Sequence, residues 1–219
     1  MSMDFTDQRL SYEKGALDQT SIPESPFELL HVWMSEAIDQ SVQEPYAMSL
    51  ATCGMDNKPS VRIVLLREIT TTGIIFYTNY ESAKGQDIAE NPNAEALFFW
   101  HELERQIRIS GKIAKIDATK SAAYFQKRPH DSQVGAWVSQ PQSGEVANRE
   151  VMEEKFAQLQ VDYPETLAVP TPKFWGGYEI TVEKIEFWQG RANRMHDRLV
   201  YVQDNNEGQP TWTTKRLLP

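Results

Sequence analysis

Cysteine and histidine are scarce in this chain. Cys53 is the single cysteine among 219 residues, which excludes an internal disulfide bond and a multi-thiolate metal site. The four histidines are not paired at the spacing of zinc ligands. We therefore expect no metal ion and a reducing, cytoplasmic setting.

Long apolar runs and an excess of positive charge are also missing. No stretch approaches the ~18 consecutive apolar residues of a membrane span, and the N-terminus has no basic segment followed by an apolar run. The net charge of −9 opposes binding to a phosphate polymer, because nucleic-acid affinity depends on basic surface. The expected partner is therefore a small anion held in a pocket, rather than a membrane or a nucleic acid.

Glycine-rich nucleotide motifs are absent as well. The sequence contains no G-x-G-x-x-G, no G-x-x-x-x-G-K-[ST] and no H-E-x-x-H. If a phosphate group binds to this protein, side chains must hold it.

The rest of the composition is that of an ordinary globular protein, with 40% hydrophobic and 24% charged residues. The length fits one domain of good size. We expect a polar N-terminal arm over residues 1–24 and a single domain over residues 25–219.

Short β-branched and aromatic runs dominate the first half of this domain. Five runs are expected to be strands: AMSLATC (47–53), SVRIVLLREI (60–69), GIIFYTN (73–79), AEALFFW (94–100) and RQIRISGKIAKI (105–116). Brief turns join most of them, which indicates an antiparallel barrel or sandwich. Later strands over 176–190, 198–203 and 210–217 are expected to complete the sheet.

Helices are expected to flank the sheet. Ser25-Pro26-Phe27-Glu28 has the pattern of a capping box with proline at the first helical position, and it predicts a helix over 26–41. Other helices are predicted over 82–91, 117–128, 131–139, with Asp131 as the cap, and 150–159. The fold class is therefore mainly β with flanking helices (α+β).

The segment 193–198, NRMHDR, places Arg194, His196 and Arg198 at every second position. In an extended segment the three side chains would point to one face, because strand side chains alternate with a period of two. Three hydrogen-bond donors would then converge on one ligand.

Two interpretations of this triplet remain open. Trp188 adds a flat apolar surface just upstream, and the combination suits a planar ligand with polar edges. The alternative is a solvated edge on which Asp197 and Glu186 are salt-bridge partners.

Arg62 and Arg67 bracket the apolar run IVLL. In a regular strand they would lie about 16 Å apart on opposite faces. A long ligand that crosses the end of the strand could contact both. The alternative is a pair of surface arginines that flank a core strand.

A phosphate clamp is predicted around the start of the 131–139 helix. Tyr124 and Arg128 are four residues apart on one helical face, and Ser132 lies where free backbone N–H groups favour an anion. Lys84 could serve a second phosphate, or it could simply be solvated.

Seven motifs together resemble one known family. They are RIVLLR (62–67), FYTN (76–79), LERQ (103–106), YFxxRPxDSQxGAW (124–137), FWGG (174–177), EFWQG (186–190) and RMHDR (194–198). In these motifs, and from about Glu44 to the C-terminus, the chain resembles the pyridoxine/pyridoxamine 5'-phosphate oxidase family. Arg9 and Tyr12 also resemble the family's N-terminal arm, which can close over the substrate.

The resemblance implies a homodimeric, FMN-binding split β-barrel with FMN in each of two sites at the subunit interface. It implies oxidation of pyridoxamine or pyridoxine 5'-phosphate to pyridoxal 5'-phosphate. The positions that match flavin contacts are Arg62, Ile63, Val64, Leu65, Arg67, Tyr77, Thr78, Lys84, Gln106, Gln142, Ser143, Trp188 and Arg198. Those that match substrate contacts are Arg67, Tyr124, Arg128, Ser132, Arg194 and His196, the last two being the catalytic pair.

The implied chemistry requires a cofactor, because no protein side chain accepts a hydride. We expect the hydride to pass from the substrate's C4' to flavin N5, and dioxygen to reoxidise the flavin with release of hydrogen peroxide. The guanidinium of Arg194 stays protonated and is assigned orientation and charge stabilisation. His196 is assigned the acceptance of the proton that leaves an alcohol substrate.

Two rival functions remain open. One is a non-catalytic protein that binds FMN or pyridoxal phosphate, and the complete triplet argues against it. The other is a related flavin oxidase of a phenazine-type precursor, and the phosphate clamp argues against that.

The chain departs from the family at two positions. Arg67 stands where the family usually has lysine, and the planar fork of arginine does not replace a flexible point charge without consequence. Ala83 stands where the family commonly has arginine, so one contact to the FMN phosphate is expected to be missing.

The Ala83 departure predicts looser FMN binding. The variant Ala83→Arg is expected to bind FMN more tightly than the wild type, because a cation would be restored beside the phosphate. A flavin titration of both proteins measures the difference, and equal affinities would contradict the expectation.

Overall fold

The computed structural model describes residues 3–4, 6, 10–204 and 211–219. The helices are α1 (Pro26–Asp39), α2 (Ala83–Glu90), α3 (Ala118–Gln126), α4 (His130–Val138) and α5 (Arg149–Asp162). The strands are β1 (Ala47–Cys53), β2 (Pro59–Leu65), β3 (Glu68–Ile69), β4 (Gly73–Asn79), β5 (Asn93–Trp100), β6 (Arg105–Lys115), β7 (Trp175–Gln189), β8 (Asp197–Asp204) and β9 (Thr211–Arg216). Single 3₁₀ turns form at His101–Leu103 and Ala192–Arg194. No helix among the described residues combines the length and the apolar character needed to cross a membrane.

The strands form one sheet in the order β2-β1-β5-β6-β7-β4-β3, with β8 paired to both β7 and β9. The pairs β3–β4, β4–β7, β7–β8 and β8–β9 are antiparallel. This arrangement confirms the predicted class, which is mainly β with flanking helices. The chain nevertheless divides into two compact units that share several strands.

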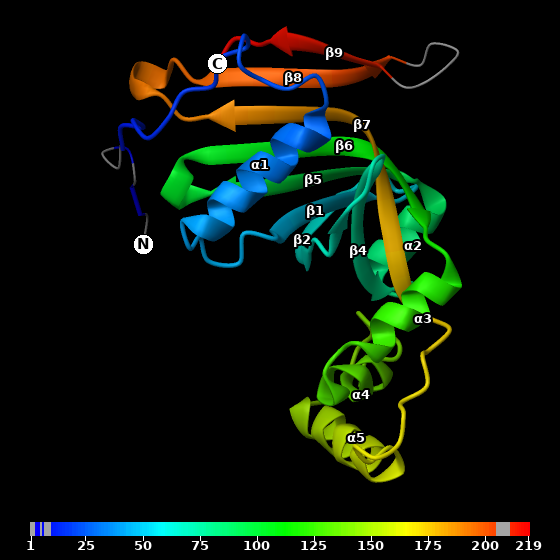
Figure 1. Cartoon of the computed structure of the whole chain (residues 1–219). Helices are drawn as coiled ribbons and strands as arrows, with labels where there is room; N and C mark the ends of the chain where they lie inside the picture. The colour runs from blue at the N-terminus through cyan, green and yellow to red at the C-terminus, as the bar shows by residue number, and fades with distance from the viewer. Residues whose placement is uncertain (1–2, 5, 7–9, 205–210) are drawn as a thin grey trace. The chain divides into compact units, whose positions relative to one another are not determined.

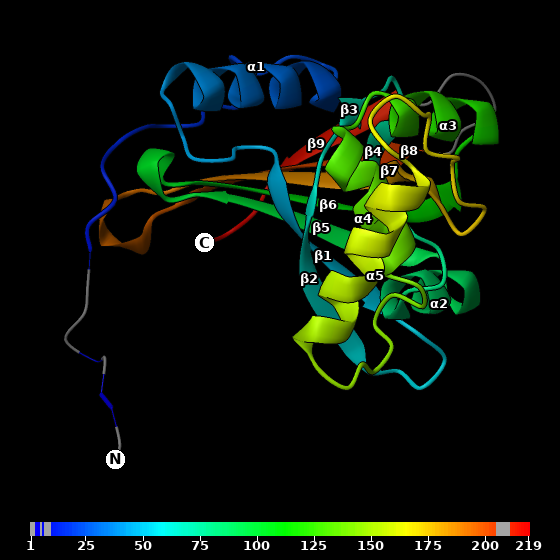
Figure 2. The same cartoon turned by 90° about the horizontal axis from the view of Figure 1, so that it is seen from below.

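The first unit comprises Met1–Ser49, Ala96–Ser110 and Val182–Pro219. Its helix α1 lies along one face of the strands (Figures 1 and 2). The ring of Trp33 in α1 meets Phe187 of β7 edge to face, with centroids 5.2 Å apart. Such burial of large aromatic rings is what fixes an amphipathic helix on a sheet.

The second unit comprises Leu50–Glu95 and Gly111–Thr181. It contains β4 paired with the first half of β7, and the helices α2 to α5. Helices α4 and α5 lie side by side in both views (Figures 1 and 2). A buried cluster of Phe125, Val134, Val169 and Trp175 joins α3, α4, a loop and the start of β7.

Three local predictions were wrong in detail. Ser25 precedes α1, but its side chain makes no capping hydrogen bond, so Pro26 at the first position is the helix-start signal that holds. Helix α4 begins at His130 with Pro129 as its cap, and Asp131 lies inside the first turn.

The third error concerns the strand expected over 60–69, which is two strands. β2 pairs with β1 at one end of the sheet order, whereas β3 pairs with β4 at the other end. The chain therefore changes partner between Leu65 and Glu68, and a single regular strand cannot do so.

Gly111 provides a test of this packing, because β6 and β7 approach closely at this residue. A Cβ atom on Gly111 would lie 1.9 Å from the carbonyl oxygen of Thr181. We expect Gly111→Ala to lower the free energy of unfolding by about 3 kcal/mol through overpacking. Urea denaturation of the variant and the wild type measures this difference in unfolding free energy.

Gly135 in α4 is the matched control, since a Cβ there would meet no atom within 4 Å. Gly135→Ala is expected to leave stability unchanged or to raise it by up to ~1 kcal/mol, because alanine favours the helix. Equal urea midpoints for the two variants would contradict the packing argument.

Candidate active site

Two adjoining cavities lie in the second unit, with volumes of about 340 and about 350 Å³. They share Tyr77, Thr78, Arg128, Gln142 and Trp175. The first is also lined by Arg62, Ile63, Val64, Leu65, Arg67, Lys84 and Tyr124, and the second also by Asn79, Ser132, Gly135, Ala136 and Ser139. The structure thus brings together every predicted site residue of this unit except Ser143.

Arg62 and Arg67 line the same cavity although the sequence spacing placed them on opposite faces of a strand. The reason is the change of strand partner after Leu65, which ends the regular alternation before Arg67. The prediction that one ligand could contact both across a strand end is compatible with this geometry.

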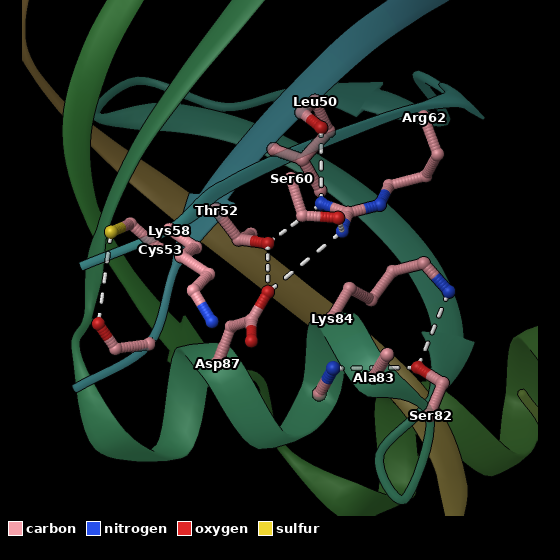
Figure 3. A network of polar contacts seen from close by, with 12 residues as sticks. Leu50, Thr52, Cys53, Lys58, Ser60, Arg62, Ser82, Ala83, Lys84 and Asp87 are labelled. Carbon is pink, nitrogen blue, oxygen red and sulfur yellow. Dashed lines mark hydrogen bonds and ion pairs between the residues drawn. The ribbon is translucent and has the colours of Figure 1, made fainter. Parts of the chain in front are cut away.

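Arg62 is anchored by the strands around it (Figure 3). Its Nη1 donates to the carbonyl oxygen of Leu50 at 3.1 Å and to Thr52 Oγ1 at 2.7 Å, and its Nη2 donates to Ser60 Oγ at 2.7 Å. Asp87 of α2 lies 3.8 Å from Nη2. Burial lowers the pKa of Arg62, and the carboxylate of Asp87 acts in the opposite direction.

Lys84 adds a second cation at the start of α2. Its Nζ lies 3.2 Å from both Thr78 Oγ1 and Ser82 Oγ, and Ser82 caps the helix by accepting from the N–H of Gly85. Burial lowers the pKa of Lys84, and the charge of Arg62 lowers it further. Two cations beside a helix N-terminus form the first cationic end of the cavity.

Arg128 forms the second cationic end, together with Ser132 in the first turn of α4. The guanidinium lies 4.8 Å from the centroid of the Trp175 ring. Its Nη1 is buried and has no hydrogen-bond partner among the described residues. Burial lowers the pKa of Arg128, Tyr124 opposes this shift, and Arg67 adds to it.

Three stacked rings also line the first cavity, together with the cationic groups. Tyr77 stacks on Tyr124 with centroids 3.9 Å apart, and Trp175 lies parallel to both. Sequence reasoning assigned no role to Trp175, although the FWGG motif contains it. The motif could have drawn attention to Trp175. Its role could not be predicted, because it depends on the stacking of rings from three different elements.

Gln142 lines both cavities, and its buried Oε1 has no partner among the described residues. A buried acceptor without a donor is costly, so the cavity is suited to a ligand that supplies one. Ser143 is placed differently, because its Oγ accepts from the N–H of Ala83 at 3.3 Å.

The remaining predicted residues lie in the first unit. Arg198 is paired with Glu186: its Nε donates to Glu186 Oε1 at 2.7 Å and its Nη2 to Oε2 at 3.1 Å. This hydrogen bonding raises the pKa of Arg198. The Glu186 salt bridge is thus present, as the alternative interpretation of the triplet proposed. Gln106 is half-buried in β6.

The triplet is not an extended strand, so this prediction was wrong. Asn193 and Arg194 have φ angles of 56° and 61°, and β8 begins only at Asp197. Left-handed backbone interrupts the period of two, and asparagine tolerates that conformation. Arg194 is exposed, whereas His196 is half-buried.

His196 is oriented by its own loop. Its Nδ1 accepts the backbone N–H of Arg191 at 3.1 Å, and its ring lies 4.8 Å from that of Trp188. The ring of Tyr12, from the N-terminal segment, lies 5.9 Å from His196. Arg9, the other arm residue named above, lies outside the described residues.

Comparison with known proteins gives the family. The model described as "Pyridoxamine 5'-phosphate oxidase" matches residues 34–161, and the one described as "Pyridoxine 5'-phosphate oxidase C-terminal dimerisation region" matches residues 175–219. The chain belongs to the pyridoxamine 5'-phosphate oxidase family. This is a family of oxidoreductase enzymes, and the match confirms the resemblance seen in the seven motifs.

Curated relatives agree over the whole length. A pyridoxine/pyridoxamine 5'-phosphate oxidase of Psychrobacter cryohalolentis is 81% identical over 100% of both chains. The one of Acinetobacter baylyi is 48% identical over 99% of this chain and 97% of its own. Among solved structures, PhzG from Burkholderia lata, in complex with tetrahydrophenazine-1-carboxylic acid, has a TM-score of 0.85 at 30% identity and covers 93% of this chain and 98% of its own. The split-barrel fold is thereby confirmed.

The residues present fit FMN, the cofactor expected from the family resemblance. The cationic ends suit phosphate groups, and the unpaired Oε1 of Gln142 suits a ring N–H. The unpaired Nη1 of Arg128 suits a second anion.

Arg128 supplies a test of this fit without any cofactor. Arg128→Met is expected to raise the unfolding free energy by about 1 kcal/mol, because a buried donor without a partner is removed. The same variant should lose part of the rise in melting temperature that inorganic phosphate gives the wild type. Thermal denaturation with and without phosphate measures both effects.

The matched control is Arg149→Met on α5, where the arginine is exposed and pairs with Glu153. This variant should respond to phosphate as the wild type does. A full phosphate response in Arg128→Met would show that Arg128 does not hold the anion.

Proposed function

We propose that this chain is an FMN-dependent oxidase that converts pyridoxamine 5'-phosphate and pyridoxine 5'-phosphate to pyridoxal 5'-phosphate. The observation that carries the proposal is a cavity with a cationic group at each of two ends and stacked aromatic rings beside them. Two phosphorylated aromatic molecules match this arrangement. The names of the curated relatives support the same substrates.

When bound, FMN would supply the hydride acceptor that the side chains lack, and dioxygen would be the final oxidant, reduced to hydrogen peroxide. In our proposal Arg62 and Lys84 hold its phosphate at the first cationic end, and Gln142 Oε1 accepts from its ring. The backbone and side chains of Ile63, Val64, Leu65, Tyr77 and Thr78 line the remaining contact surface.

The substrate phosphate is assigned to Arg128, Tyr124 and Ser132 at the second end, with Arg67 nearby. Trp175 lies under the guanidinium of Arg128 and limits its movement. Holding both phosphates fixes the two rings relative to each other. Such orientation can lower the activation barrier by several kcal/mol, out of the roughly 7–11 kcal/mol that positioning can contribute.

Gln106, Ser143, Trp188 and Arg198 remain proposed flavin contacts from the family resemblance. We place FMN at the interface of a homodimer, and the match of residues 175–219 to a dimerisation region supports this assembly. Sedimentation measures the oligomeric state.

Arg194 and His196 are proposed to face the substrate ring. Arg194 is exposed, and the donors of its guanidinium can orient the substrate and stabilise negative charge. The hydrogen bond from the N–H of Arg191 occupies Nδ1 of His196 and therefore leaves its proton on Nε2. This geometry favours a hydrogen-bond donor at Nε2 over the base expected from the sequence.

Substitutions of His196 separate a donor from a base. Glutamine places an N–H donor near the position of Nε2 but cannot accept a proton, so His196→Gln should retain turnover within about tenfold of the wild type, since one hydrogen bond is preserved. His196→Ala should lose about 100-fold, in the range of a lost catalytic group. Turnover of pyridoxine phosphate as a function of pH measures both.

If His196→Gln were as slow as His196→Ala and also lost the acidic limb of the pH profile, His196 would be a base. Near-full turnover in His196→Asn would mean that neither role is required.

The proposed activity has a direct test. The purified protein should show a yellow flavin spectrum. Addition of pyridoxamine phosphate in air should give pyridoxal phosphate, ammonia and peroxide in equal amounts, because water hydrolyses the imine that loss of hydride leaves. A yellow protein without turnover would instead support the binding-only function.

Oxidation of a phenazine-type precursor is the second candidate, because the PhzG structure resembles this chain over nearly its full length. The cationic end around Arg128 favours a phosphorylated substrate instead. A reduced phenazine carboxylate offered in the same assay should therefore react more slowly than pyridoxamine phosphate.

A further inference from the structure

Thr52 and Asp87 belong to no family contact assigned above, yet they surround the guanidinium of Arg62 (Figure 3). We propose that Thr52 and Asp87 are positioning residues that hold Arg62 in place for the phosphate of FMN. This inference rests on the proposed function, because it names the residues behind one of its cofactor contacts.

Arg62, Thr52 and Asp87 form a hydrogen-bonded chain, called the relay below. The direction of each hydrogen bond in it follows from the chemistry of the three side chains. A carboxylate can only accept and a guanidinium can only donate, so the Thr52 hydroxyl must donate to Asp87 and accept from Arg62. The distances are 2.6 Å from Thr52 Oγ1 to Asp87 Oδ2 and 2.7 Å from Arg62 Nη1 to Thr52 Oγ1. Thr52 is almost fully buried in β1, which leaves its hydroxyl no competing water.

The relay leaves part of Arg62 available to a ligand. Of the five N–H groups of an arginine, three are used by Leu50, Thr52 and Ser60. Within the described part of the chain, the Nε–H has no acceptor at hydrogen-bond distance, and Arg62 lines the cavity. Two of the five N–H groups, the one on Nε and the second one on Nη2, are thus left for an anion in the cavity that Arg62 lines.

Asp87 also balances charge without neutralising Arg62. Its carboxylate lies 3.8 Å from Nη2, beyond a direct hydrogen bond, and its shortest bond is to Thr52. The side chains of Arg62 and Asp87 are only 20% and 24% exposed, so water screens this pair weakly. Arg62 therefore keeps a donor surface for an anion while its burial is partly compensated.

Helix α2 places the support of Arg62 at the first cationic end of the cavity, where the FMN phosphate is proposed to bind. Lys84 and Asp87 are three residues apart on α2 and so lie on one face of the helix. One helix thus presents a cation to the cavity and an anion to the arginine beside it. Arg62 and Lys84 line the same cavity, and the charge of Arg62 lowers the pKa of Lys84 in addition to the effect of burial.

The test compares two flavins and two substitutions at one residue. Thr52→Val removes the hydroxyl at nearly constant shape, and Thr52→Ser retains it. Quenching of flavin fluorescence gives the affinity of each protein for FMN and for riboflavin, which lacks the phosphate. We expect Thr52→Val to bind FMN about tenfold more weakly, the effect of one charge-assisted hydrogen bond. Its riboflavin affinity, and both affinities of Thr52→Ser, should stay within about twofold of the wild type.

Asp87 is tested independently, and its control lies on the same helix. Asp87→Asn should weaken FMN by about fivefold, with KM for pyridoxamine phosphate unchanged at saturating FMN. Glu90→Gln makes the same charge change on α2, where Glu90 accepts from the N–H of Met55. This variant should bind FMN as the wild type does. If Thr52→Val does not fold, as judged by circular dichroism, this pair of variants carries the test.

Three outcomes would overturn the inference. Unchanged FMN affinity in Thr52→Val and Asp87→Asn would show that Arg62 needs no support. An equal loss for FMN and riboflavin would indicate a general packing defect. Tighter FMN binding by Asp87→Asn would make the carboxylate a competing charge only. If the wild type binds no FMN at all, the proposed function fails first and the inference fails with it.

Discussion

The gathering of four cationic side chains around one cavity is the constraint on which the rest of the site depends. Arg62, Arg67, Lys84 and Arg128 all line it, and burial lowers the pKa of three of them. Removing cations from water and placing them side by side is unfavourable unless neighbours hold them in position. Asp87 supplies an opposite charge, and Trp175 supplies the face of an aromatic ring. The fold therefore maintains a charged cavity that phosphates can complete.

Much of the fold follows from local patterns. The helix predicted over 26–41 is Pro26–Asp39, and the strand predicted over 105–116 is Arg105–Lys115, because both segments have a clear hydrophobic period. The errors occur where the backbone changes direction for reasons outside the segment. The break after Leu65 depends on which strands β2 and β3 pair with, and no local period contains that information.

Site residues that belong to a recognisable motif could be predicted from the sequence. Residues outside the motifs that hold those side chains in place could not. Arg62 and Arg128 were found because their motifs resemble those of a family. Thr52 and Asp87 were not, since they are 35 positions apart and meet only when α2 packs beside β1. The loop before β8 shows a motif that misled the prediction. Its cationic residues alternate with a period of two in the sequence, but the left-handed backbone at Asn193 prevents an extended strand.

Gly135 has a consequence for how this cavity can change. It lines the cavity near Ser132, and a side chain added there would meet no atom within 4 Å. An alanine can therefore be introduced at this point of α4 without displacing a neighbouring atom. The width of the second cavity can therefore change by a single substitution at this position of α4, whereas the crowded glycines of the sheet leave no room for a side chain.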